Sequence, residues 1–251
     1  MWKVVSRSAW HAVLLVWGLF LVFPPTELMA GTLASSVEPA DQPFGLPTSM
    51  VTTGTLLEKW LDVEHEVDDE RRVLKLCDQD RASCPSQAAL RFLAIVDGAR
   101  TLEGRARLGE INRAINLKIR PMSDLALYGA EDVWSPPLAT LARGAGDCED
   151  YAIAKFVALQ EAGVSADDLR IVILRDDVRD EDHAVVAARL DGNWLMLDNL
   201  HMAMAEDQQV PDYYRPTFLI DRDGVKRYSG ASSVSEGARG NQGAIGQIRR
   251  R

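Results

Sequence analysis

The 251-residue sequence is poor in several of the residue types from which binding sites are built. It contains three cysteines and four histidines, and aromatic residues make up 7% of it. The formal net charge is -9, and no Lys/Arg run interleaved with aromatics occurs outside the last few residues. Both features argue against nucleic acid as a partner. With 47% apolar and 26% charged residues, the chain has an ordinary globular composition and is long enough for one large domain or for a domain with extensions.

The apolar run near the N-terminus is too short to be a typical membrane span. It covers residues 12–23, whereas a spanning helix needs about 20 residues. Lys3 and Arg7 precede it, and Ala30 offers a small residue at a cleavage point. We therefore expect residues 1–30 to be a signal peptide, with an uncleaved N-terminal anchor as the alternative. In either case the rest of the chain would lie outside the cytoplasm, and we predict a periplasmic protein.

Three cysteines in an exported chain leave one without a partner. Cys77 and Cys84 flank a polar loop, and an oxidising compartment favours a disulfide between them. Cys148 is then the odd thiol. An unpaired cysteine in an exported protein is either buried and inert or reactive, and a position at the start of a helix favours the reactive interpretation.

The segment around Cys148 predicts such a helix. Apolar residues recur at helical spacing from the cysteine up to a glycine stop at Gly163. A thiol in the first turn is favoured as thiolate by about 0.3–1 kcal/mol, through the helix dipole and free N–H groups. However, Asp147, Glu149 and Asp150 raise the pKa of a neighbouring thiol by like charge. Their charge must therefore be taken up by a cation or by backbone N–H groups.

Away from this segment, periodicity divides the chain into helices followed by strands. Helical patterns cover residues 56–74, 86–97 and 108–116, and strand patterns cover 169–174, 183–190, 193–197, 217–220 and 225–228. Within the third helix, Asn112 and Asn116 are interpreted as structural hydrogen bonders. We predict an α+β fold with N-terminal helices packed on an antiparallel sheet. The domain is expected at residues 55–228, an irregular leader at 31–54 and a disordered tail at 229–251.

A hairpin in the strand region supplies partners for the thiol. Asp191 and Gly192 form a type I′ turn signal, so the ladder beyond it places His183 and Asp198 on one face as diagonal neighbours. Their Cβ atoms would be roughly 7–8 Å apart. With Cys148 they would act as nucleophile, base and orienter. Taken singly, a Cys or His is more often structural; His183 could instead cap a loop, and His201 is a second candidate base.

The strongest family resemblance rests on four short motifs. These are Gly-Asp-Cys-Glu-Asp-Tyr-Ala at 146–152, Asp-Val-Trp-Ser-Pro-Pro at 132–137, His-Ala-Val at 183–185 and Leu-Asp-Asn at 197–199. Together they resemble the bacterial transglutaminase-like cysteine proteinase family, from about residue 60 to residue 220. The resemblance implies a papain-like, transglutaminase-like core in which Cys148, His183 and Asp198 form the catalytic triad.

The same resemblance implies calcium binding by Asp147 and Glu149, the acids that flank the nucleophile. A hard cation with oxygen ligands would neutralise the charge beside the thiolate. Two carboxylates cannot fill six to eight coordination positions, so backbone carbonyls, water and Asp150 are expected to contribute. The alternative is that Asp147 and Asp150 only cap the helix.

These observations favour an exported, calcium-dependent cysteine endopeptidase that acts on a protein substrate. The resemblance implies a large surface adhesin as the substrate and an inner-membrane receptor as a regulator. Two alternatives stay open: acyl transfer to an amine instead of water, which the same triad would serve, and a catalytically idle calcium-binding interaction module.

Overall fold

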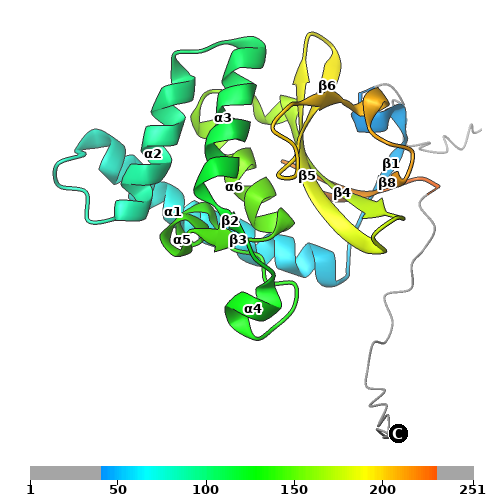
Figure 1. Ribbon diagram of the computed structural model, residues 1–251, viewed down its shortest axis with the longest axis horizontal. Coiled ribbons are helices and arrows are strands. Elements are labelled where there is room, and N and C mark those ends of the chain that lie inside the picture. The colour runs from blue at the N-terminus through cyan, green and yellow to red at the C-terminus, as the bar shows by residue number, and fades with distance from the viewer. Residues whose placement is uncertain (1–40, 231–251) are drawn as a thin grey trace, which may run out of the picture. The chain divides into compact units, whose positions relative to one another are not determined.

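The structure is a computed structural model that describes residues 41–230. The predicted signal peptide, the first part of the leader and nearly all of the predicted tail lie outside these residues. None of the helices between residues 41 and 230 is both long enough and apolar enough to cross a membrane. The described part has the predicted α+β architecture, with helices on one side of an antiparallel sheet (Figure 1).

The first half of the domain is mainly helical. Its elements are η1 (Pro43–Gly45), β1 (Thr48–Met50), α1 (Thr55–Gln79), α2 (Gln87–Arg100), α3 (Gly104–Lys118), β2 (Arg120–Pro121), α4 (Asp124–Tyr128), α5 (Pro137–Arg143), β3 (Ala145–Gly146) and α6 (Cys148–Glu161). The second half contains η2 (Ala166–Asp168), β4 (Leu169–Asp176), β5 (Glu181–Leu190), β6 (Asn193–Leu197), β7 (Ala205–Glu206), η3 (Asp207–Gln209), β8 (Tyr214–Asp221) and β9 (Gly224–Tyr228).

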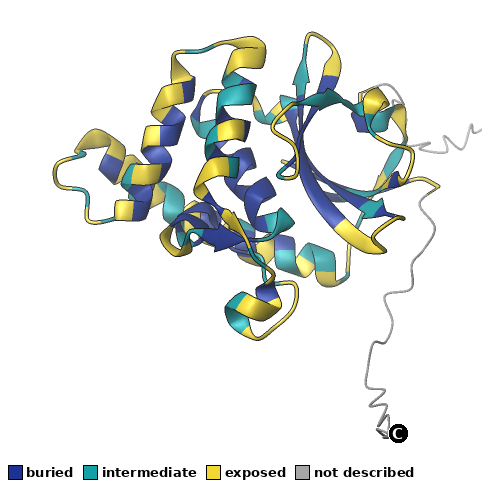
Figure 2. Ribbon diagram, viewed as in Figure 1, coloured by how far each residue is buried: buried dark blue, intermediate teal, exposed yellow. Residues whose placement is uncertain are grey.

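Helix α6 is the central helix of the domain. Its residues are buried on nearly every side, from Asp150 to Leu159, as expected for a helix without a clear polar face. It packs against α2, α3, α5 and the strands β4 and β5. Figure 2 shows this contrast, since α6 and β5 are largely buried while the outer faces of α1 and α2 are exposed.

The sheet has seven strands in the order β1-β9-β8-β4-β5-β6-β7, and all its pairs are antiparallel. Both faces of its central strands are buried. In β4, Ile171 and Ile173 belong to the main core under the helices, whereas Val172 and Leu174 belong to a second apolar cluster. The sheet curves around this second cluster (Figure 1), which explains the near-continuous apolar runs in β4 and β5.

All five strands expected from the sequence are present, whereas the short edge strands β1 and β7 and the separate β2–β3 pair were not expected. Strand β6 has the predicted bounds, while β4, β5 and β8 are longer than predicted. Strand β1 lies within the segment expected to be irregular. It pairs with β9, with Thr48 opposite Tyr228. Three residues held at an edge by backbone bonds leave no hydrophobic period to detect.

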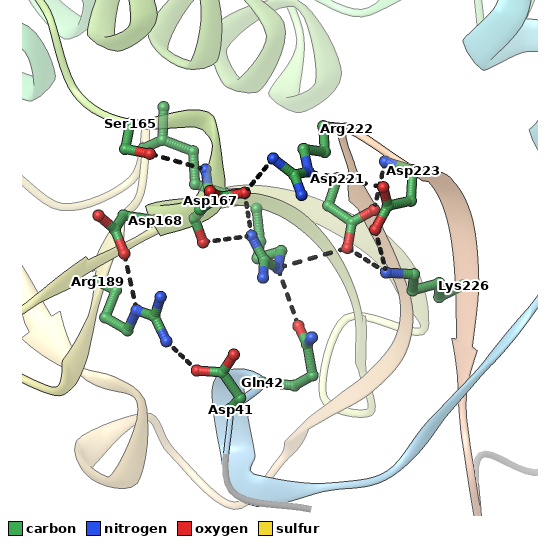
Figure 3. Close-up of polar contacts among 12 residues, drawn as sticks. Asp41, Gln42, Ser165, Asp167, Asp168, Arg189, Asp221, Arg222, Asp223 and Lys226 are labelled. Atoms are coloured by element: carbon green, nitrogen blue, oxygen red, sulfur yellow. Dashed lines mark hydrogen bonds and ion pairs between the residues drawn. The ribbon is translucent and has the colours of Figure 1, made fainter. Parts of the chain in front are cut away.

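A polar cluster joins the first described residues to one end of the sheet (Figure 3). The guanidinium of Arg170, which is buried, donates from Nε to Gln42 Oε1 at 2.9 Å and lies 3.7 Å from Asp221 Oδ2. Arg189 bonds to Asp41 and Asp168. The cluster thereby connects residues 41–42 with β4, β5 and β8.

The expected disulfide between Cys77 and Cys84 is present. It closes the loop after α1, and Cys77 is buried in the main core. Cys148 is the free cysteine, as the odd-thiol argument predicted.

Candidate active site

The thiol of Cys148 is placed by a short turn between two helices. Helix α5 ends at Gly144, whose φ of 70° is a left-handed conformation that favours glycine. The chain then pairs with β2: Arg120 N–H donates to Gly144 O at 3.0 Å and Met122 N–H to Gly146 O at 2.9 Å. Helix α6 begins at Cys148, so the predicted helix start is confirmed. The half-buried thiol therefore lies in the first turn of the central helix.

His183 and Asp198 are brought together by the β5–β6 hairpin. The register runs from Leu190 opposite Asn193 to Val186 opposite Leu197, as predicted from the turn. His183 Nε2 lies 2.9 Å from Asp198 Oδ1, and both side chains are buried. Asp198 Oδ1 also accepts a hydrogen bond of 2.9 Å from Leu200 N–H.

The carboxylate of Asp198 is stabilised by its neighbours. Burial raises its pKa, but the hydrogen bond and charge of His183, the N–H of Leu200 and the charge of Lys155 together lower the pKa below its usual value. The imidazole of His183 stacks on Tyr214, with 5.9 Å between ring centroids. Because Asp198 engages Nε2, the other ring nitrogen, Nδ1, is left for a reacting group.

The thiol itself is held in its neutral form by its surroundings. Cys148 Sγ donates to Glu149 Oε2 at 2.9 Å. Burial and the charge of Glu149 raise the pKa of Cys148 well above its usual range, against a lowering by the N–H of Ala184. Within residues 41–230, no hydrogen bond joins the thiol to His183; its contact with β5 is with the next residue, Ala184. Burial and the neighbouring carboxylate therefore favour the neutral thiol.

Three carboxylates gather beneath the start of α6. Asp124, Asp147 and Asp150 each offer an oxygen within 4.8 Å of the others. Burial, followed by the charges of Glu149, Asp124 and Asp150, raises the pKa of Asp147 to about 9. Burial also raises the pKa of Asp150 to about 7, despite a hydrogen bond from Ser135 N–H. Concentrated negative charge that the protein does not neutralise favours a cation.

The remaining hydrogen-bonding capacity of these acids fits a hard cation. Asp150 Oδ1 accepts from Ser135 N–H at 3.0 Å and Asp124 Oδ2 accepts from Val133 N–H. Asp124 Oδ1, Asp147 Oδ1 and Asp150 Oδ2 are buried without a partner within residues 41–230. Such a set of hard oxygen donors suits Ca²⁺, with the remaining positions left to carbonyls and water.

The helix-cap alternative for these acids is not what the structure shows. The side chain of Asp147 makes no capping bond to α6, and Asp150 bonds to Ser135 instead. Asp150 also packs closely on Gly146, where a Cβ atom would lie 2.4 Å from Asp150 Oδ2. Glycine is therefore needed at 146 for space, not for backbone conformation.

The acids at this site differ in part from the predicted metal ligands. Of the two predicted ligands, Asp147 is in the cluster, while Glu149 lies between Asp147 and the thiol of Cys148. Asp150 was expected to contribute, but Asp124 was missed. Asp124 precedes the nucleophile by more than twenty residues in a segment that had no periodic pattern, so only the tertiary fold brings it there.

The chain beyond Asp198 is held by the asparagines of α3. Asn112 Nδ2 donates to Met202 O at 3.2 Å, and Asn116 Nδ2 donates to Asp198 O at 2.9 Å. Their predicted role as structural hydrogen bonders is confirmed. The alternative base, His201, lies exposed in the loop that these asparagines anchor.

A cysteine at the start of a central helix, beside a His–Asp pair on an antiparallel sheet, is the arrangement of papain-like thiol hydrolases. The family model described as bacterial transglutaminase-like cysteine proteinase matches residues 71–216, more than half of the chain. The chain therefore belongs to this family and is a cysteine peptidase. A comparison with curated proteins returned no significant match.

Solved structures support the same fold. LapG from Legionella pneumophila has a TM-score of 0.51 and 24% identity, covering 65% of this chain and 89% of that chain. The EGTA-treated form of the same protein has a TM-score of 0.52 and 24% identity, covering 65% of this chain and 87% of that chain. The calcium-bound form has a TM-score of 0.51 and 23% identity, covering 65% of this chain and 91% of that chain. At these identities the likeness concerns the fold.

Proposed function

We propose that the chain is an exported, calcium-dependent cysteine endopeptidase that uses Cys148, His183 and Asp198 as a catalytic triad. The observation that carries the triad is the bond of 2.9 Å between His183 Nε2 and Asp198 Oδ1, beside the helix that begins at Cys148. This pair leaves Nδ1 of His183 for the thiol, while Asp198 fixes the tautomer.

In this proposal the residues act in the order of acyl transfer. His183 takes the proton of Cys148, and the thiolate attacks the scissile carbonyl to form a tetrahedral intermediate. The N–H groups in the first turn of α6 are suited to stabilise its oxyanion. His183 then gives its proton to the leaving amine, and water, activated by His183, hydrolyses the acyl-enzyme.

Calcium is assigned to the acids beneath the nucleophile. Asp124, Asp147 and Asp150 would hold the ion, with Glu149 at its edge, because three of their buried oxygens have no partner within residues 41–230. The bound ion would supply positive charge that offsets these carboxylates. A calcium-bound structure of Legionella pneumophila LapG supports this choice of metal.

Export and the identity of the substrate rest on the sequence. The basic and apolar N-terminus favours a periplasmic location, and a Cys77–Cys84 disulfide suits an oxidising compartment. We include in the proposal a large surface adhesin as the protein substrate and an inner-membrane receptor as the regulator.

Alkylation of the single free thiol tests the triad without a known substrate. Wild-type protein, His183→Gln and Asp198→Asn are treated with iodoacetamide at neutral pH with calcium present, and labelling is followed by intact mass. We expect Cys148 to react more slowly in both variants, because the base or its orienter is lost. Equal alkylation rates in all three proteins would contradict the proposed triad.

Cleavage of natural substrates tests the reaction type. Surface proteins from the producing cells are incubated with wild-type protein or Cys148→Ala, and new termini are identified by mass spectrometry. New N-termini that depend on Cys148 support endopeptidase activity. Isopeptide cross-links without new termini would show acyl transfer to amines instead.

A further inference from the structure

The segment that carries Asp198 lies just beyond the regular pairing of the sheet. Strand β6 ends at Leu197, so the next residue is not held by a strand ladder. Two side chains from the helices hold this point instead. Lys155 Nζ donates to Leu197 O at 3.2 Å, and Asn116 Nδ2 donates to Asp198 O at 2.9 Å.

Lys155 is an unusual residue for this position. It lies on α6, seven residues after Cys148, so two helical turns place both on the same side of the helix. Only 1% of Lys155 is exposed. A buried ammonium is costly unless it is paired. Its neighbours are the Leu197 carbonyl, the charge of Asp198 and the ring of Tyr151, whose centroid is 5.9 Å from Nζ.

Lys155 and Asp198 each favour the charged form of the other. Burial lowers the pKa of Lys155 to about 7, while the charge of Asp198 raises it. In turn, Lys155 helps to lower the pKa of Asp198. The ammonium therefore favours the ionised carboxylate while its hydrogen bond fixes the backbone immediately before it.

We propose that Lys155 is a positioning residue, whose hydrogen bond to the Leu197 carbonyl keeps the carboxylate of Asp198 directed at His183. This inference rests on the proposed function, in which Asp198 orients the imidazole. Lys155 is buried inside the domain and would act through Asp198 without touching the substrate.

The test replaces the ammonium with an apolar chain of similar length. In Lys155→Met, the alkylation rate of Cys148 by iodoacetamide at neutral pH with calcium should fall about 10- to 100-fold, as expected for loss of a charged hydrogen bond. The melting temperature should fall while the variant stays folded, because the substitution leaves the Leu197 carbonyl without its donor and Asp198 with less compensation of its charge. The ¹⁵N shifts of the His183 imidazole should move towards those of Asp198→Asn.

Leu159→Met provides the matched control. Leu159 is fully buried one turn further along α6, and exchange of Leu for Met conserves volume. This variant should keep the wild-type alkylation rate and imidazole shifts. Lys155→Gln, which retains an N–H donor without the charge, should lie between wild type and Lys155→Met.

The outcomes separate this inference from the proposed triad. If His183→Gln slows alkylation but a folded Lys155→Met or Lys155→Gln keeps the wild-type rate and shifts, only the role of Lys155 is overturned. If His183→Gln has no effect, the triad fails and the inference with it. Loss of folding in both Lys155 variants would make the residue part of the core and would also overturn the inference.

Discussion

At the scale of single residues, the neighbourhood of Cys148 contains two opposed electrostatic effects. Burial and then the carboxylate of Glu149 raise the pKa of the thiol, whereas the N–H of Ala184 lowers it. The cluster of Asp124, Asp147 and Asp150 lies beside the same turn and has partnerless buried oxygens. Neutralising this charge is therefore one physical requirement of the site.

Calcium should consequently stabilise the folded protein. A ligand that binds only the folded state adds about 2.7 kcal/mol at 100 times its dissociation constant. We expect the melting temperature to rise on calcium addition and to fall back with EGTA. Asp124→Asn should reduce this rise, because it removes one of the three clustered carboxylates. Differential scanning calorimetry measures both effects.

The control for this prediction is Asp69→Asn. Asp69 is exposed and pairs only with Arg72 within the described residues, so its ion pair adds little stability. Its calcium-induced shift should equal that of the wild type. An undiminished shift in Asp124→Asn would remove Asp124 from the proposed metal site.

Gly146 should be intolerant of a side chain. A Cβ atom at this position would lie 2.4 Å from Asp150 Oδ2 and 2.7 Å from Asp150 Cβ. We expect Gly146→Ala to lower the unfolding free energy by about 1–3 kcal/mol, as overpacking does, and to weaken the calcium-induced shift. Urea denaturation with and without calcium measures both.

Gly109→Ala is the matched control for added volume. Gly109 lies inside α3, and its Cβ would meet Met204 at an ordinary 3.5 Å. Because Ala is about 1 kcal/mol better than Gly in a helix interior, this variant should be neutral or stabilising. Equal tolerance at both glycines would show that Asp150 moves freely.

At the scale of elements, α1 supports the helix that leads to the nucleophile. The carboxylate of Glu70 accepts hydrogen bonds from Leu138 N–H at 2.7 Å and Ala139 N–H at 3.0 Å. The first N–H groups of a helix have no partner within the helix, and the N-cap residue of α5 offers them no side-chain acceptor. The start of α5 thus depends on a residue distant in sequence.

This contact should make stability depend on pH. Burial raises the pKa of Glu70 from 4.5 to about 7, although both N–H bonds lower it. Because the folded state holds the proton more tightly, this contribution is fully present below pH 4.5 and is lost as pH rises through about 7. The loss amounts to roughly 1.4 kcal/mol per pKa unit.

Glu70→Gln should remove this part of the dependence. Unfolding free energies from urea titrations between pH 4.5 and 8 should fall less steeply in the variant than in the wild type. Glu66→Gln, one turn earlier on the exposed face of α1, should retain most of the wild-type slope. Parallel curves for Glu70→Gln and wild type would contradict the assignment.

The elements also show which parts of the site were predictable. The start of α6 and the β5–β6 register depend on local signals, the glycines before Cys148 and the Asp191-Gly192 turn, so both were predicted. Asp124, Lys155 and Glu70 gain their roles from contacts between distant elements. Their local patterns only indicated helices or loops, and β1 had no pattern, so sequence reasoning missed them.

At the scale of the whole domain, two cores share one sheet. The helices cover one face, and the second apolar cluster fills the curve of the other. The polar cluster in Figure 3 lies where this curved sheet meets residues 41–42. Arg170 and Arg189 also lie over the ring of Trp194, with guanidinium carbons 5.1 and 5.5 Å from its centroid.

Arg170 should therefore stabilise the domain as a unit without affecting the thiol. Arg170→Met leaves Lys226 as the one charged partner of the buried Asp221 among residues 41–230, beside the N–H of Asp223, and removes the bond to Gln42. Breaking a buried ion pair costs about 3–5 kcal/mol, and each kcal/mol is worth about 2–4 °C in a domain of this size. Calorimetry should show this loss, whereas Arg222→Met, at an exposed position, should change the melting temperature little.

Iodoacetamide should alkylate Cys148 at the wild-type rate in both variants, because the Arg170 cluster shares no described contact with the triad. A selective loss of thiol reactivity in folded Arg170→Met would instead show that the two cores are coupled through the sheet.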